Sequence, residues 1–194
     1  MHRLVAIVGI DGSGKTTLAK TLVAQLCSEG RRVRSFENAG GRPPLNWLAR
    51  RLGHDDAQKW LGTARLEAIE QRFRHVPMRL AATWARLPGE RTAILDRWTV
   101  CQYAAMRARG SEDASARRRY RRLPWPDHVL FLDVSPEQAH ARLRQRGTDV
   151  DELDWLHAAY AAYRSLPEWD ALTVIDGAGS PADVVARARA CTEI

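Results

Sequence analysis

A short glycine-rich motif near the amino terminus constrains this chain more than any other feature. Residues Gly9–Thr16 read GIDGSGKT, which satisfies the pattern G-x-x-x-x-G-K-[ST]. The motif directly follows the apolar run Leu4–Val8 and opens the segment Lys15–Glu29, whose leucines recur with helical spacing. A strand, a glycine loop and a helix in this order predict a phosphate-binding loop (P-loop), because the glycines let backbone N–H groups turn inward around an anion.

The residue types in the loop indicate separate tasks. We expect Lys15 to reach the β- and γ-phosphate oxygens of a nucleotide, and Thr16 to offer its hydroxyl to Mg²⁺. The predicted nucleotide-binding set of this segment comprises Gly9, Asp11, Gly12, Ser13, Gly14, Lys15, Thr16 and Thr17.

The rest of the chain alternates between short β-rich runs and stretches with helical periodicity. The predicted strands are Leu4–Val8, Val33–Phe36, Thr92–Leu95, Val129–Leu132 and Leu172–Ile175. No internal repeat and no Gly/Ser linker divides the 194 residues. We therefore expect one α/β domain over residues 1–194, a three-layer P-loop fold in which helices flank both faces of a five-stranded parallel sheet.

Several helix boundaries can be predicted from single residues. Ser135 and Ser180, each followed by proline, are expected to cap the helices that follow them. The helical region from 45 to 87 is interrupted near residues 53–55, and Pro77 is expected to end or kink a long helix. That helix carries the apolar residues Leu66, Ile69 and Phe73.

Composition excludes several protein classes. Lys and Arg number 30 against 23 Asp and Glu, a net charge of +7, and 45% of the residues are hydrophobic, so the chain is neither an acidic disordered nor a collagen-like one. Cys27, Cys101 and Cys191 are an odd number at wide spacing, which predicts neither a disulfide framework nor a metal knuckle. We expect no membrane span, no signal peptide and a cytoplasmic location.

Two carboxylates are candidates for the metal side of the site. Asp96 and Asp133 each end a predicted strand, and a doubly wound sheet places its ligands at the carboxyl ends of its strands. Asp96 is favoured because Arg97 follows at once and adds a cation for the transferred phosphate. Asp133 is interpreted instead as a structural carboxylate that binds loop backbone.

A helix with several arginines precedes a short polar segment. Arg142 and Arg146 share one face of this helix, whereas Arg144 points elsewhere. The polar residues 147–151 then favour a lid, over about 142–152, that closes over a nucleotide. The alternative is a solvated basic face.

The densest basic run of the chain is Arg117–Arg122, which reads RRRYRR. Because charge runs on helices are usually solvated, we interpret it as an exposed connection. Contact with the acceptor or product, and binding of a polyanion, are the alternatives.

Matched against these positions, the chain resembles the thymidylate kinases over nearly its whole length. These are nucleoside monophosphate kinases with a P-loop. The resemblance is carried by the phosphate loop Gly9–Thr17, by Asp96-Arg97-Trp98, by the strand Pro126–Val134, by Arg142 and Arg146 at the start of the lid, by Tyr163–Leu166 and by Arg72-x-x-His75.

The resemblance implies a fold, a reaction and a set of ligands. It implies transfer of the ATP γ-phosphate to a nucleotide-like acceptor with Mg²⁺, with Thr16 and Asp96 at the metal and Arg97 between donor and acceptor. It also implies a turn containing Gly177 near the adenine, Arg142 and Arg146 closing over ATP, and a possible homodimer. The candidate acceptor-binding residues are Asp11, Glu37, Arg72, Arg97 and Cys101, and the resemblance implies that Arg72 would reach the base.

The acceptor side departs from the family pattern. The family usually ends its second strand with an arginine that helps hold the acceptor, but here Phe36 or Glu37 occupies that place. Ala105 stands where a tyrosine is common, and Cys101 replaces a serine or threonine. These departures spare the ATP side and affect mainly acceptor recognition.

Glu37 therefore leaves the type of acceptor open. A phosphate acceptor is already anionic and needs alignment rather than a base, whereas an alcohol acceptor needs a carboxylate to take its proton. Glu37 resembles in position the base of deoxynucleoside kinases. Its other interpretations are a salt bridge to an arginine such as Arg42 or Arg97, and a loop cap.

The leading hypothesis is an ATP- and Mg²⁺-dependent kinase of the thymidylate kinase type that acts on dTMP or a related nucleoside monophosphate. One alternative is a kinase of a nucleoside or other small hydroxyl compound with Glu37 as general base. Another is a nucleic-acid-associated P-loop ATPase or regulator, although a nucleic-acid partner is disfavoured.

Overall fold

The computed structural model describes residues 3–38, 40–147 and 152–194. The elements run in chain order as β1 (Arg3–Val8), α1 (Lys15–Ser28), β2 (Val33–Glu37), α2 (Arg42–Arg51), α3 (Ala57–Leu61), α4 (Thr63–Ala85), β3 (Thr92–Asp96), α5 (Thr99–Ala108), α6 (Ala114–Tyr120), β4 (His128–Asp133), α7 (Pro136–Arg146), α8 (Leu153–Arg164), the 3₁₀ turn Trp169–Ala171, β5 (Thr173–Asp176) and α9 (Pro181–Thr192). No helix in these described ranges has the length and apolar character needed to cross a bilayer.

The strands form one sheet in the order β2-β3-β1-β4-β5, and every pairing is parallel. This confirms the predicted five-stranded parallel sheet. Each strand boundary differs from the prediction by at most one residue. In the register of the sheet, Asp96 of β3 lies opposite both Ile7 of β1 and Glu37 of β2. The sheet thus gathers its acidic strand ends at one edge, next to the loop that follows β1.

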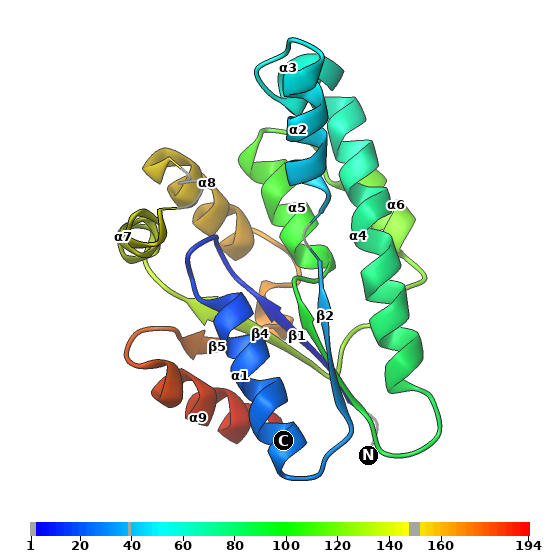
Figure 1. The fold of residues 1–194 in the computed structure, drawn as a ribbon, viewed down its shortest axis with the longest axis vertical. Coiled ribbons are helices and arrows are strands. Elements are labelled where there is room, and N and C mark those ends of the chain that lie inside the picture. The colour runs from blue at the N-terminus through cyan, green and yellow to red at the C-terminus, as the bar shows by residue number, and fades with distance from the viewer. Residues whose placement is uncertain (1–2, 39, 148–151) are drawn as a thin grey trace.

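Helices flank both faces of the sheet (Figure 1), and alternate residues of the three central strands, β3, β1 and β4, pack into different cores. Val5 and Ile7 of β1 join a core with Leu18 and Leu22 of α1. The alternate β1 residues Leu4, Ala6 and Val8 join a second core, which includes residues of α4, α5 and α8. A strand buried on both faces explains why the predicted strands read as continuous apolar runs.

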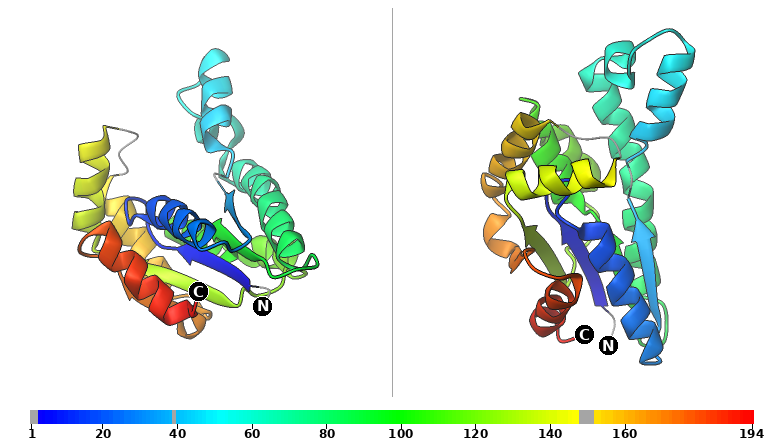
Figure 2. Two further views of the ribbon diagram at one scale, coloured as in Figure 1. Left: turned by 60° about the horizontal axis from the view of Figure 1, so that its bottom comes forward. Right: turned by 60° about the vertical axis from the view of Figure 1, so that its left-hand side comes forward.

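A group of helices extends beyond the carboxyl edge of the sheet. Figure 2 shows α2 and α3 beside the first half of α4, well away from the strands. Among the described side chains, the buried residues of their small core are Ala49, Ala57 and Leu66, with Leu45 and Trp60 packed against it. The break predicted near residues 53–55 is confirmed as the connection between α2 and α3.

Of the two effects predicted for Pro77, the structure contradicts an end of the helix, because α4 continues to Ala85; a kink stays a prediction. Proline removes the hydrogen bond to the carbonyl four residues earlier, which here belongs to Phe73. Phe73 is more than half exposed, so this carbonyl lies on the solvent side of the helix. Beyond the proline, the burial of Met78, Ala81 and Ala85 holds the last turns against the sheet.

The two serine caps are confirmed. The side chain of Ser135 accepts a hydrogen bond from the amide of Gln138 at the start of α7. Ser180 and Asp183 form a full capping box at the start of α9.

The basic run Arg117–Arg122 is only partly a free surface. Arg117 donates to Asp113 at 2.8 Å and also pairs with Glu168, which ties α6 to the segment after α8. Arg118 is exposed, and so are the last two arginines of the run. Burial would raise the pKa of Asp113, but Arg117 and Arg107 outweigh it and hold that pKa below its usual range.

We expect Arg117→Gln to lower the free energy of unfolding by about 1–2 kcal/mol at neutral pH, because it removes a network of charged hydrogen bonds. The matched change Arg118→Gln should stay within about 0.5 kcal/mol of the unmodified chain. A carboxylate with a lowered pKa stabilises the fold above its unfolded pKa and loses this effect as the pH falls. Urea denaturation at pH 7 and near pH 3 should therefore show the difference shrinking in acid; equal stability of the two variants at pH 7 would contradict the assignment.

Candidate active site

The loop between β1 and α1 is shaped by glycines with positive φ. Gly9, Gly12 and Gly14 have φ angles of 143°, 82° and 100°. A Cβ atom on Gly12 would lie only 2.4 Å from the carbonyl oxygen of Ala139 in α7. Helix α7 thus packs directly on the loop backbone, and only glycine permits this approach.

Lys15 is enclosed by the loop that it follows. Its side chain is 4% exposed, and Nζ donates to the carbonyl of Ile10 at 2.6 Å and lies 3.6 Å from Oδ1 of Asp11. Burial lowers the pKa of Lys15, and the nearby guanidinium of Arg97 lowers it further. The ammonium group is thus held at the phosphate loop by one carbonyl and one carboxylate oxygen.

Asp96, at the carboxyl end of β3, faces the first turn of α1. Its Oδ2 accepts a hydrogen bond from Oγ1 of Thr16. Asp133, on the opposite side of β1, instead accepts from the Tyr160 hydroxyl at 2.8 Å. Of the two candidate carboxylates, Asp96 is therefore the one that meets the hydroxyl of the phosphate loop.

The surroundings of Asp96 fit a divalent cation. Its second oxygen, Oδ1, is buried and has no hydrogen-bond partner among the described residues. Mg²⁺ prefers oxygen ligands and is usually held by one or two protein groups together with substrate phosphates. Within the described ranges no cluster of three or more His, Cys, Asp or Glu residues is placed to hold a metal ion.

Arg97 adopts a backbone conformation that non-glycine residues rarely use, with φ at 79°. Its amide donates to the carbonyl of Ile7 at 2.9 Å, and its guanidinium pairs with Asp11. Burial would lower the pKa of Arg97, but the carboxylate of Asp11 raises it above the usual range. Burial would raise the pKa of Asp11, yet Arg97 and Lys15 hold it far below its usual range. The strained turn therefore aims a permanent cation across the phosphate loop.

A cavity of about 210 Å³ lies beside the phosphate loop. Arg142 on its wall donates to the carbonyls of Ser13 at 3.3 Å and of Gly177 at 3.0 Å. Arg146 also lines the cavity, which confirms that these two arginines share a face. Other lining residues include Gly14, Thr17, Leu18, Gly179 and Val184. The turn that contains Gly177 thus borders the space next to the loop.

The lid predicted for about 142–152 lies partly outside the described residues. Positions up to Gly147 and from Glu152 onward are described, whereas 148–151 are not. The first part of the predicted lid belongs to α7, which carries Arg142 and Arg146.

Glu37 ends β2 beside Asp96, but its side chain is 65% exposed. It forms an ion pair with Lys20 of α1, at 3.9 Å from Nζ to Oε1. The side chain of Arg42, one of the two arginines considered from the sequence, lies outside the described side chains. The carboxylate lies on the α1 side of the sheet edge.

The arginines of α4 are arranged differently from the sequence expectation. Arg72 is exposed, whereas Arg74 is 8% exposed and its Nη1 donates to the carbonyl of Asn38 at 3.4 Å. Two residues correspond to about 200° of rotation around a helix, so the two arginines point in opposite directions. Cys101 is buried in the first turn of α5, where its amide donates to the carbonyl of Trp98 at 3.0 Å.

Sequence reasoning missed three buried polar residues on this side. The described structure gives no hydrogen-bond partner to Nε of Arg74, to Oδ1 of Asn38 or to either amide atom of Gln102. The signal that could have found Arg74 is a row of polar residues at helical spacing, formed by Glu67, Glu70, Gln71 and Arg74, all of which are buried. Phe73, which the sequence placed in the apolar pattern, is exposed instead.

The comparisons with known proteins agree on one family. A sequence profile described as thymidylate kinase matches residues 7–188. A probable thymidylate kinase of Archaeoglobus fulgidus is 28% identical over 189 residues, which cover 94% of this chain and 90% of the relative. A thymidylate kinase of Cereibacter sphaeroides is 32% identical over 203 residues, with 95% and 91% covered. One of Xanthomonas euvesicatoria is 34% identical over 151 residues, which cover 74% of this chain but only 62% of the relative.

We expect Gly12→Ala to weaken ADP binding about 10-fold or more, because the new methyl group meets the α7 backbone and the residue must keep a positive φ. Gly110→Ala is the matched control, since Gly110 has a φ of 75° with open space around it. Isothermal titration with ADP, together with the melting temperature of each variant, separates the loop effect from general strain. Equal ADP affinity in the two variants would mean that the loop tolerates displacement of α7.

Proposed function

Because the chain belongs to the thymidylate kinase family, we propose that it transfers the γ-phosphate of ATP to a nucleoside monophosphate, with dTMP or a related nucleotide as the acceptor. The observation that carries the proposal is the meeting of Lys15, the Thr16–Asp96 pair and Arg97 at one edge of the sheet. These groups are what phosphoryl transfer requires, since catalysis of this reaction rests on positioning and electrostatic stabilisation.

The donor side needs cations and backbone amides around the triphosphate. Lys15 and the loop amides would hold the β- and γ-phosphates, and Arg142 and Arg146 would lie along the nucleotide in the adjoining cavity. Thr16 and Asp96 would hold Mg²⁺, which supplies neutralisation of phosphate charge when bound. Arg97 would turn from Asp11 towards the transferred group, because a phosphate dianion is a stronger partner than one carboxylate.

A nucleoside monophosphate needs no strong base on the enzyme, because its phosphate oxygen is already anionic. An acceptor that needs no base is consistent with the position of Glu37, whose side chain is mostly exposed and paired with Lys20. The nucleic-acid alternative loses part of its support, since Arg117 of the basic run is engaged with Asp113 and Glu168. The cytoplasmic location, the single domain over 1–194 and the homodimer stay predictions.

The test of the reaction is mass spectrometry of the products formed from ATP, Mg²⁺ and a panel that pairs each nucleoside with its 5′-monophosphate. We expect dTMP or a related monophosphate to become a diphosphate while the nucleosides stay unchanged. Phosphate gained only by a nucleoside or another hydroxyl compound would overturn the proposal in favour of a hydroxyl kinase. Hydrolysis of ATP that is stimulated by polynucleotides, without any acceptor product, would favour the regulator alternative.

Glu37→Gln separates the two kinase hypotheses. We expect kcat to stay within about threefold of the unmodified enzyme, because the side chain points to solvent and a phosphate acceptor needs no base. Asp96→Asn is the reference for a damaged site and should lower kcat about 100-fold, since it weakens the proposed metal ligand. A severe loss of kcat in Glu37→Gln with unchanged ATP binding would identify Glu37 as a base.

A further inference from the structure

The end of β2 offers no cation to an acceptor. Phe36 is buried against the ring of Trp84, with the ring centroids 6.0 Å apart, and Glu37 carries a negative charge. A phosphate placed opposite the phosphate loop would therefore have to find its positive partners elsewhere.

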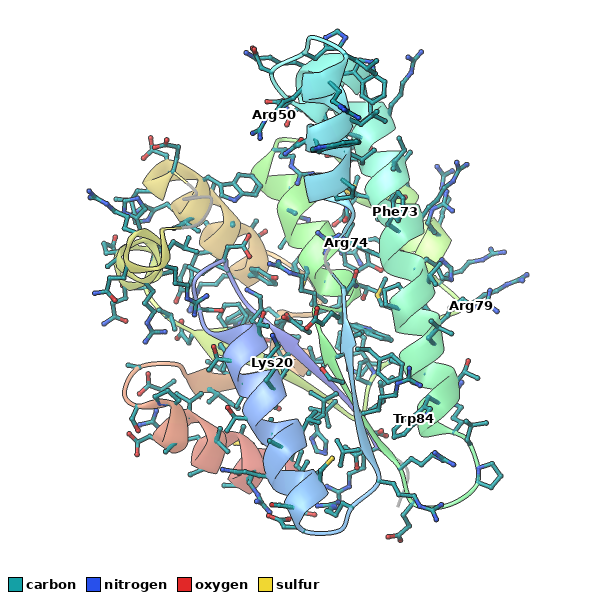
Figure 3. All side chains as sticks on the ribbon, viewed as in Figure 1. Lys20, Arg50, Phe73, Arg74, Arg79 and Trp84 are labelled. Atoms are coloured by element: carbon teal, nitrogen blue, oxygen red, sulfur yellow. The ribbon has the colours of Figure 1, made fainter. Side chains whose placement is uncertain are left out.

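Arg74 of α4 fills the space beside the loop that follows β2. A Cβ atom built on Gly40 would lie 2.5 Å from its Nη2 and 2.7 Å from its Cζ, so the guanidinium lies directly against this backbone. The contact to the Asn38 carbonyl fixes one end of the guanidinium, and Asn38 in turn donates to the carbonyl of Arg97 at 3.4 Å. Figure 3 shows Arg74 on the side of α4 that faces α5, near the end of β2.

The charges around Arg74 point to a missing anion. Burial lowers the pKa of Arg74, and repulsion from Arg97 lowers it further, while Glu70 offsets part of this. Glu70 also pairs with Arg109, at 3.3 Å. The pKa of Asp11 is lowered by Arg97, Lys15 and Arg74 together. Nε of Arg74 is buried and has no hydrogen-bond partner in the described ranges. Gathering cations in a buried place is costly unless an anionic ligand joins them.

We propose that Arg74 binds the 5′-phosphate of the acceptor together with Arg97, and so makes the site selective for nucleoside monophosphates over free nucleosides. This inference rests on the proposed function and adds a residue that distinguishes a charged acceptor from an uncharged one. The guanidinium presents planar paired donors that match phosphate oxygens, and the wall of backbone at Asn38 and Gly40 keeps it in place.

The test compares binding of dTMP and thymidine by isothermal titration in the presence of ADP. Arg74→Gln should weaken dTMP binding about 30-fold or more, which is the usual loss for one charged hydrogen-bonding partner, while thymidine binding changes less than about threefold. Arg74→Lys keeps the positive charge but loses the paired guanidinium donors. Its affinity for dTMP should lie between those of the unmodified protein and Arg74→Gln. Arg79→Gln, on the same helix and exposed, is the matched control and should bind both ligands as the unmodified protein does.

Equal loss of dTMP and thymidine affinity in Arg74→Gln would overturn the proposal, because it would indicate a role in the base contact or in folding. The proposal also fails if the selective loss appears in Arg72→Gln instead, or if Arg74→Gln binds dTMP normally. An unmodified protein that binds ADP but no nucleoside monophosphate would overturn the proposed function itself, and this result is read before any variant is measured. If Arg74→Lys keeps the ADP affinity and the melting temperature of the unmodified protein, a folding defect is excluded as the cause of its weaker dTMP binding.

Discussion

The hydrogen bond from the amide of Arg97 to the carbonyl of Ile7 organises the catalytic edge. It continues the pairing of β1 and β3 one residue past Asp96, and only then does the chain turn through a positive φ. The Asp96 side chain is thereby directed at Thr16, and the guanidinium of the next residue is directed at Asp11. The register of two strands, whose inner residues are buried on both faces of the sheet, thus places two side chains of the candidate site.

Asp11 acts as an internal counterion for this edge. Arg97, Lys15 and Arg74 all lower the pKa of its carboxyl group, and the charges of Lys15 and Arg97 would repel each other without it. A nucleotide phosphate brings more negative charge than this carboxylate and competes for the same cations. Asp11 stays in place when a nucleotide binds, so a bound phosphate would add its negative charge to that of Asp11 and share the same cations.

Features that depend on local sequence could be predicted, and features that depend on how a helix is rotated could not. The phosphate loop, the strands, the serine caps and the shared face of Arg142 and Arg146 all follow from the spacing of neighbouring residues. For α4, the apolar pattern of Leu66, Ile69 and Phe73 was only partly informative, because Leu66 is buried but Phe73 is exposed, while Arg74 is buried with other polar residues of the helix. A helix turns 100° per residue, so a shift of one or two positions exchanges Arg72 for Arg74. Packing against α5 and α6 decides that rotation, and no local pattern carries this information.

The small core of α2, α3 and the first half of α4 has a consequence for dynamics. Few buried side chains hold these helices together, while the sheet has a large core on each face. The free energy needed to open this group is therefore lower than that of global unfolding, and its amides exchange hydrogen through subglobal opening. A ligand that bridges α4 and the loop after β2 slows this exchange in proportion to its occupancy. The outer helices thus act as a local reporter of whether the acceptor side is filled.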